Sequence, residues 1–154
     1  MGLLGKLLRA FRPAGKSKED IQRLTAAAEA GDVAAQYELA MLYGLGKDVE
    51  RDDALSLEWG RKAAEQGHAE AQFFLASCYR LGSGVERDEE QVFTWVSRSA
   101  AQGFDEAQFG LGMCYHLGEG VQKDDAKAVH WFRKAAEQGH AGARKALAHA
   151  NVSV

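Results

Sequence analysis

The two cysteines are the most reactive side chains of this sequence. Cys78 and Cys114 lie 36 positions apart, which is also the period of an internal repeat described below. Equivalent helices of stacked repeats lie roughly 10 Å apart, whereas a disulfide needs Cα atoms about 4.4–6.8 Å apart. We therefore predict two small buried or half-buried thiols and no disulfide, redox pair or metal pair.

Five histidines could supply metal ligands or a general base. His116, His130 and His149 show no H-E-x-x-H or other metal-ligand spacing. His68 and His140 share one offset of the repeat, which an aspartate and a phenylalanine fill in the other copies. That variability is typical of a helix junction, so we predict no metal site.

Two Gly-x-Gly pairs, Gly82-x-Gly84 and Gly118-x-Gly120, resemble part of a phosphate-binding loop. They follow predicted helices rather than strands, and they lack the Gly-Lys-Ser/Thr ending of such loops. Turns that need positive φ explain these glycines better. We predict no catalytic residue, no cofactor-binding residue and no cofactor.

One 36-residue stretch recurs three times without a gap, at residues 33–68, 69–104 and 105–140. A fixed period of about 20–50 residues indicates a repeat architecture, in which a unit cannot bury its apolar face alone. The most regular positions are a glutamine, a tyrosine, a tryptophan and a glycine: Gln36, Gln72 and Gln108; Tyr43, Tyr79 and Tyr115; Trp59, Trp95 and Trp131; Gly67, Gly103 and Gly139.

Within each repeat, helical periodicity and turn residues predict two helices joined by a glycine-rich turn, and the first helix is expected to end near the tyrosine. Asp52, Asp88 and Asp124 stand where a helix N-cap belongs. Half repeats at 18–32 and 141–154 cover the ends of the array. The capping-box spacing of Ser17 and Asp20 predicts a helix that begins at about Lys18. The sequence thus predicts an all-α fold, an α/α superhelical solenoid of about eight antiparallel helices in 36-residue helix–turn–helix repeats. Asp48 replaces a glycine in the first turn, so we expect left-handed geometry there.

The pattern AQFxLGxCYxLGxGVxxDxxxAxxWxxKAAEQGH closely resembles the Sel-1-like repeat family, relatives of tetratricopeptide repeats. The resemblance implies an α/α superhelix that binds other proteins, often as a bacterial adaptor or regulator. Some cysteine-rich members are linked to penicillin binding or hydrolysis. This sequence has no Ser-x-x-Lys and no Ser-Asp-Asn, so we expect a non-enzymatic protein.

Partner-binding residues should lie where the copies differ. By resemblance to tetratricopeptide arrays, the variable arc of each first helix faces a concave groove, and interfaces favour aromatic, methionine and arginine side chains. Tyr37, Phe73 and Phe109 on this arc are expected to pack between repeats. The candidates for binding a protein or peptide partner are Met41, Glu70, Phe74, Ser77, Arg80, Glu106, Met113 and His116.

The charge distribution separates the first residues from the rest of the chain. Residues 1–18 hold five basic residues and no acidic one, so residues 19–154 hold 14 basic and 22 acidic residues, a net charge of −8. An acidic body argues against nucleic acid as a partner. No apolar run reaches the ~18 residues of a membrane span, and no secretory signal is evident. We expect a cytoplasmic protein.

Residues 1–17 are predicted to form a basic amphipathic segment and a linker. An apolar stripe that includes Leu4, Leu7, Leu8 and Phe11 could bind membrane lipid, a partner or the solenoid itself. Two functions therefore remain open. One is a protein-interaction adaptor that binds its partner in the groove of the solenoid, residues 18–154. The other is a regulator held at the inner membrane through peripheral contact of residues 1–12.

Overall fold

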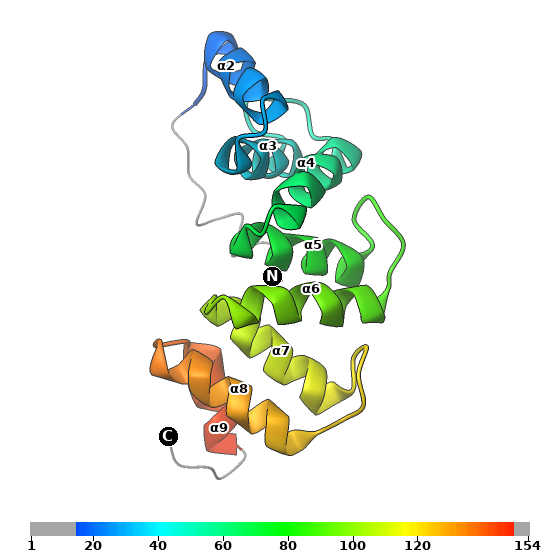
Figure 1. The fold of residues 1–154 in the computed structure, drawn as a ribbon, viewed down its shortest axis with the longest axis vertical. Helices are drawn as coiled ribbons and strands as arrows, with labels where there is room; N and C mark the ends of the chain where they lie inside the picture. The colour runs from blue at the N-terminus through cyan, green and yellow to red at the C-terminus, as the bar shows by residue number, and fades with distance from the viewer. Residues whose placement is uncertain (1–14, 150–154) are drawn as a thin grey trace. The chain divides into compact units, whose positions relative to one another are not determined.

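A computed structural model describes residues 15–149, and these residues form helices and no strand. Figure 1 shows the helices as successive coils joined by short turns. The eight helices are α2 (Lys18–Glu29), α3 (Val33–Leu45), α4 (Asp53–Glu65), α5 (Ala69–Leu81), α6 (Glu89–Ala101), α7 (Asp105–Leu117), α8 (Asp125–Glu137) and α9 (Ala141–His149). The prediction of an all-helical solenoid of about eight helices is confirmed over these residues.

The chain divides into two compact units. The first ends at Arg87 and holds α2 to α5, and the second begins at Asp88 and holds α6 to α9. In the first unit, α3 packs against both α2 and α4, and α4 packs against α5. In the second unit, α7 packs against α6 and α8, and α8 packs against α9.

The predicted helix starts are confirmed. Ser17 and Asp20 form a capping box at α2, in which each side chain bonds the backbone N–H of the other residue. The hydrogen bond from Ser17 holds the pKa of Asp20 below its usual value. Asp52, Asp88 and Asp124 cap α4, α6 and α8 by accepting backbone N–H groups of the first turn. Such caps satisfy donors that have no partner within the helix.

The first helices of the repeats end two residues later than the sequence suggested. We expected α3, α5 and α7 to end near a tyrosine, but they continue to Leu45, Leu81 and Leu117. The glycine that follows each of them adopts the left-handed conformation and donates its N–H to the last turn. Glycine reaches this conformation without steric cost, so the tyrosine does not have to end the helix.

The turn at Asp48 keeps the geometry of the other repeats by a different interaction. Gly84 and Gly120 have φ of 70° and 66°, and Asp48 has φ of 64°, as predicted. A Cβ at Gly84 would lie 2.6 Å from the carbonyl oxygen of Asp53. Asp48 instead points its carboxylate at the chain before α2, where Oδ2 accepts the backbone N–H of Lys16 at 3.0 Å.

The core of each unit is built from apolar side chains, some of which recur at one offset of the repeat, as Leu39, Leu75 and Leu111 do. Leu39, Leu42 and Leu75 are fully buried in the first unit, and a cluster around Phe132, Ala135 and Leu147 forms the core of the second. Both cysteines are buried thiols, as predicted.

Each of the three tryptophans has a basic side chain over its ring. Trp59 and Trp95 are buried, whereas Trp131 is half-buried. Lys62, Arg98 and Lys134 lie 4.1, 4.5 and 4.9 Å from the ring centroids of Trp59, Trp95 and Trp131. The tryptophans therefore pack inward with one face, while a cation three residues later covers them from outside.

The apolar stripe predicted for the first residues, with Leu4, Leu7, Leu8 and Phe11, lies outside the described residues. The described chain begins beside α3, where Lys16 Nζ lies 2.8 Å from a carboxylate oxygen of Glu38. Within residues 15–149, no helix combines the length and apolar character needed to cross a bilayer.

The close approach at Gly120 should make it the more sensitive of two left-handed glycines. A Cβ at Gly120 would collide with the backbone carbonyl of Glu89, whereas at Gly118 the nearest atom lies 3.5 Å away. Both alanine variants carry the backbone strain of about 1–3 kcal/mol. We expect urea denaturation to show a clearly larger loss of unfolding free energy for Gly120→Ala than for Gly118→Ala. Equal losses would contradict the close approach.

Candidate functional site

Three of the eight predicted binding residues are buried, and their selection as exposed groove residues is wrong. Met41, Phe74 and Ser77 are 1%, 3% and 3% exposed. In α5 every residue from Ala71 to Tyr79 is buried, so this helix has no open arc in its middle turns. Ser77 Oγ donates to the carbonyl of Phe73, one turn earlier.

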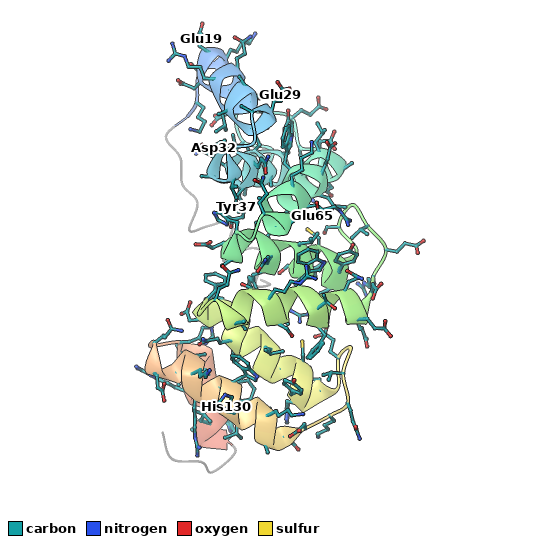
Figure 2. All side chains as sticks on the ribbon, in the orientation of Figure 1. Glu19, Glu29, Asp32, Tyr37, Glu65 and His130 are labelled. Atoms are coloured by element: carbon teal, nitrogen blue, oxygen red, sulfur yellow. The ribbon has the colours of Figure 1, made fainter. Side chains whose placement is uncertain are left out.

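The variable arc is partly covered because its aromatic residues pack on the next helix junction. The Tyr37 ring (Figure 2) lies 4.8 Å from the ring of His68, and Phe109 stacks on His140 at 4.5 Å. Burial raises the pKa of Tyr37 to about 12. His68 and His140 each accept the N–H of the third residue of the following helix through Nδ1, so the prediction that they mark helix junctions is confirmed.

Three more candidates lie near the ends of their helices. Glu70 is near the start of α5, with a carboxylate oxygen 3.2 Å from His68. A carboxylate oxygen of Glu106 lies 3.1 Å from Nε2 of His140, and this contact supports the junction before α9. Arg80 is half-buried near the end of α5. Glu70 and Arg80 lie near opposite ends of α5, so these two residues do not form one site.

Met113 and His116 are the two candidates that the structure brings together. They line a pocket of about 580 Å³ between α7, α8 and α9, here called the α7–α9 pocket. Most of its wall is apolar, and its polar groups are one aspartate and two histidines. The lining residues are Met113, His116, Asp125, Ala128, Val129, Phe132, Ala146 and His149.

The polar groups of the α7–α9 pocket lie at exposed positions. His116 Nδ1 is 2.8 Å from Oδ1 of Asp125, and these side chains are 51% and 62% exposed. Their hydrogen bond holds the pKa of Asp125 below its usual value, so this carboxylate is charged at neutral pH. Lys123 Nζ lies 3.6 Å from the second carboxylate oxygen, Oδ2.

A second pocket occupies the equivalent place in the first unit. The α3–α5 pocket has a volume of about 150 Å³ and is lined by Gly44, Arg51, Asp53, Ser56, Phe74, Cys78 and Ser83. A shift of 72 positions relates Gly44 to His116, Asp53 to Asp125, Ser56 to Ala128 and Phe74 to Ala146. The two pockets are therefore one feature of the repeat, with different side chains.

The size difference follows from an exchange of large and small residues. In the first unit the Phe74 ring lies against Gly60, so closely that a Cβ there would be 2.5 Å from the ring. In the second unit Ala146 replaces Phe74, and Phe132 replaces Gly60. The ring of Phe132 lies against Gly112 instead. We attribute the larger α7–α9 pocket to the absence of an aromatic side chain at Ala146.

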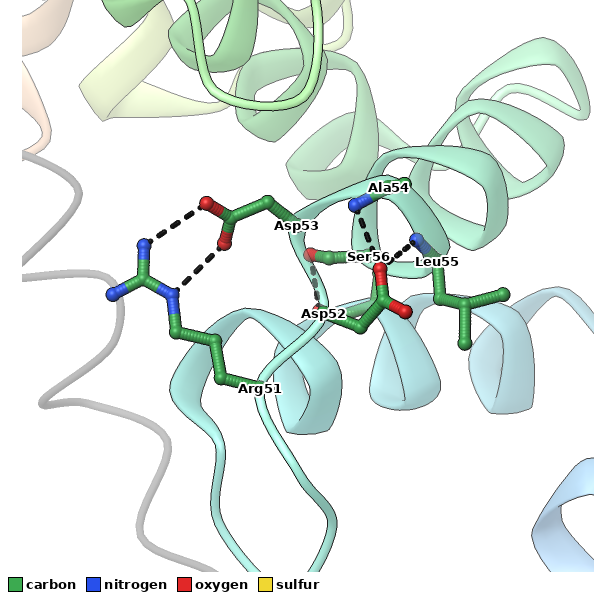
Figure 3. Close-up of polar contacts among 7 residues, drawn as sticks. Arg51, Asp52, Asp53, Ala54, Leu55 and Ser56 are labelled. Atoms are coloured by element: carbon green, nitrogen blue, oxygen red, sulfur yellow. Dashed lines mark hydrogen bonds and ion pairs between the residues drawn. The ribbon is translucent and has the colours of Figure 1, made fainter.

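The polar contacts at the two pockets also differ. Figure 3 shows Arg51 and Asp53 joined by two parallel contacts, Nε to Oδ1 at 2.9 Å and Nη2 to Oδ2 at 3.1 Å. Lys123 takes the place of Arg51 in the second unit. An ammonium cannot form the paired contact of a guanidinium, so Oδ2 of Asp125 is held less closely than its counterpart.

The lining of the α7–α9 pocket offers little for catalysis. It contains no serine, threonine, cysteine or lysine that the His116–Asp125 pair could activate, as nucleophilic catalysis would need. Among residues 15–149, no group of three or more histidine, cysteine, aspartate or glutamate side chains could hold a metal ion. His130 projects from α8 (Figure 2), and its ring lies edge-on to Trp131.

Sequence reasoning missed six of the pocket residues. Four of them lie in the second helix of a repeat, whereas the predicted binding arc lies on the first helices: Asp125, Ala128, Val129 and Phe132. Ala146 and His149 belong to the last half repeat, for which we predicted only that it covers the end of the array. Comparing Ala146 with Phe74 two repeats earlier was the signal that could have found the pocket.

Cys78 should resist thiol reagents in the folded protein. Burial raises the pKa of this thiol to about 12, so the reactive thiolate is scarce at pH 8. We expect slow labelling by Ellman's reagent at pH 8 and rapid labelling of both cysteines in guanidinium chloride. A Cys114→Ser variant isolates the signal of Cys78. Rapid labelling of that native variant would contradict the buried, protonated thiol.

The α7–α9 pocket should accept a larger side chain at Ala146 but not at Ala143. Ala143 is fully buried in the core cluster, where added bulk typically costs about 1–3 kcal/mol. Ala146 lines the pocket, so Ala146→Phe should change the unfolding free energy by less than about 1 kcal/mol. Urea denaturation followed by circular dichroism compares Ala146→Phe with Ala143→Phe. Equal destabilisation would show that the space beside Ala146 is not available.

Comparisons with solved structures agree with this architecture. A Sel1 repeat protein from Oxalobacter formigenes is 42% identical, with a TM-score of 0.79 over 84% of this chain and 98% of that chain. A protective antigen of uropathogenic Escherichia coli with an SLR fold is 38% identical, with a TM-score of 0.82, and the match covers 84% of this chain and 28% of that chain. Cysteine rich protein B of Helicobacter pylori shares the fold at 24% identity, with a TM-score of 0.65 over 87% of this chain and all of that one (100%).

A comparison with proteins of curated function found no match. The family model described as "Sel1 repeat" matches residues 33–68, 69–104 and 105–140, which are the three repeats read from the sequence. The chain therefore belongs to the Sel1 repeat family.

Proposed function

We propose that this chain is a non-enzymatic protein-interaction module and that a partner protein binds at the α7–α9 pocket. Proteins built from Sel1 repeats are generally protein-interaction modules, which supports the first part of the proposal. The open pocket of about 580 Å³ supports the second part.

The pocket has the composition expected of a binding site for a side chain of another protein. Interface cores are apolar and rich in methionine and aromatic residues, with a polar rim. Here Met113, Val129 and Phe132 form apolar wall, while His116 and Asp125 are exposed polar groups. Binding sites for small groups are likewise mostly apolar, with a few placed polar atoms that fix orientation.

Half-exposed apolar residues beside the pocket extend this surface. Met113 and Val129 are only partly buried although they pack against the core of the second unit. Leu117, in the last turn of α7, is 64% exposed. A partner that covers these groups would remove apolar area from water, which is the main favourable term in most protein association.

The proposal is tested by blocking the pocket without removing any contact. Immobilised full-length chain would be compared with Ala146→Phe and with Ala148→Phe, an exposed position two residues further along α9. Quantitative mass spectrometry of proteins retained from a bacterial lysate should identify a partner that the wild type and Ala148→Phe retain equally. Ala146→Phe should retain at least tenfold less of this partner, since a blocked hot spot typically costs 2 kcal/mol or more.

Equal retention by all three forms would contradict binding at the α7–α9 pocket. Thermal unfolding of Ala146→Phe provides the control for folding. A partner lost from both phenylalanine variants would place the binding surface elsewhere on α9.

A further inference from the structure

We propose that the α7–α9 pocket receives an aromatic side chain of the partner protein, with an arginine of the partner beside it on Asp125. This inference rests on the proposed function and names the chemistry of the group that is bound. The first argument comes from the chain's own repeat. Where the first unit has Phe74 beside the α3–α5 pocket, the second unit has Ala146 and open space.

The α3–α5 pocket thus shows what the same backbone arrangement accepts. Of the three helices around this pocket, the third, α5, provides the Phe74 ring. The ring lies against Gly60 of the second helix, α4. At the α7–α9 pocket the third helix has the methyl group of Ala146 at the position of Phe74, and His149 of the same helix also lines the pocket. An apolar cavity of about 150 Å³ can hold a benzene molecule, so a pocket of about 580 Å³ has room for an aromatic side chain beside Phe132.

The second argument is charge complementarity. Asp53 beside the α3–α5 pocket binds the guanidinium of Arg51 through both carboxylate oxygens. Its counterpart Asp125 is hydrogen-bonded to His116 through Oδ1, while Oδ2 has the ammonium of Lys123 no closer than 3.6 Å. A guanidinium from the partner can therefore donate an N–H to Oδ2 while Oδ1 stays with His116, which favours an aromatic residue with a neighbouring arginine.

The probe that tests this chemistry is the capped dipeptide N-acetyl-Phe-Arg-amide. Methionine methyl groups labelled with carbon-13 provide the signal in the full-length chain, which has three methionines. Met113 lines the α7–α9 pocket, and Met41 is its buried equivalent in the first unit. We expect a saturable shift of the Met113 signal and no shift of the Met41 signal.

Control dipeptides separate the two parts of the proposal. N-acetyl-Ala-Arg-amide should bind at least tenfold more weakly, because burial of a phenyl group typically contributes about a factor of 10 to 100. N-acetyl-Phe-Gln-amide should bind about two- to fivefold more weakly, as expected for an exposed ion pair. Equal affinity of the alanine and phenylalanine dipeptides would overturn the aromatic occupant.

Matched variants of the chain locate the contacts. Asp125→Asn should remove the preference for arginine over glutamine, whereas Asp53→Asn should leave it unchanged, because Asp53 lies in the other unit. Ala146→Phe should abolish the Met113 shift, and Ala148→Phe should preserve it. A shift that persists in Ala146→Phe would overturn the proposed position of the ring.

Nuclear Overhauser contacts in the protein without the probe test whether the chain fills its own pocket. Contacts from Phe132 to Phe11, Val152 or Val154 would overturn a partner as the occupant, and no such contacts are expected.

The proposed function and the proposed chemistry of the pocket can fail separately. If Ala146→Phe loses its partner but no dipeptide binds, the aromatic occupant is wrong and the proposed function stands. If the dipeptide binds but Ala146→Phe retains every partner, the pocket chemistry stands and the proposed function is wrong.

Discussion

A buried glutamine amide bridges three of the described junctions between the second helix of one repeat and the first helix of the next. The side chains of Gln36, Gln72 and Gln108 donate to the carbonyls of Ala28, Ala64 and Ala100, eight residues earlier, at 3.0, 3.1 and 3.5 Å. These carbonyls lie at helix ends, and each also accepts the backbone N–H of the glycine three residues later, Gly31, Gly67 or Gly103. Each amide therefore adds a second hydrogen bond at a carbonyl of the preceding helix and holds two helices in register, and such a hydrogen bond typically contributes about 0.5–1.5 kcal/mol to stability.

This constraint leaves the repeat free to vary elsewhere. At the last junction Arg144 stands in place of the glutamine. There His140 caps α9 through Nδ1, as His68 caps α5, and its Nε2 also lies 3.1 Å from Glu106. With the helices held by polar contacts at their ends, an apolar position such as Ala146 can lose a large side chain without loss of the helix arrangement. The exchange of Phe74 and Gly60 for Ala146 and Phe132 is such a change.

The sequence predicted the fold well because capping and turn residues, each a weak signal alone, recur at the same offsets in every repeat. Ser17, Asp52 and the left-handed Asp48 were each placed from residue type and offset, and backbone geometry at helix ends depends on those two properties. The binding residues were predicted poorly. Burial of Met41 and Phe74 depends on side chains from other helices, and helical periodicity alone assigned them to an exposed arc. Met113 and His116 were found because they share that arc. Their neighbours Phe132 and Ala146 were not, because packing between helices brings them together.

The open apolar pocket beside Ala146 provides a place for binding but lowers the stability of the fold. A phenylalanine at the equivalent position of the first unit fills the space between α4 and α5, and well-filled cores are the more stable ones. The half-exposed Met113 and Val129 therefore cost the second unit part of the stabilisation that burial would provide. Residues that lower stability in this way are typical of functional sites, where filling the space raises stability and removes binding. The contrast between Phe74 and Ala146 in one chain is thus a stronger indication of function than the presence of either pocket alone.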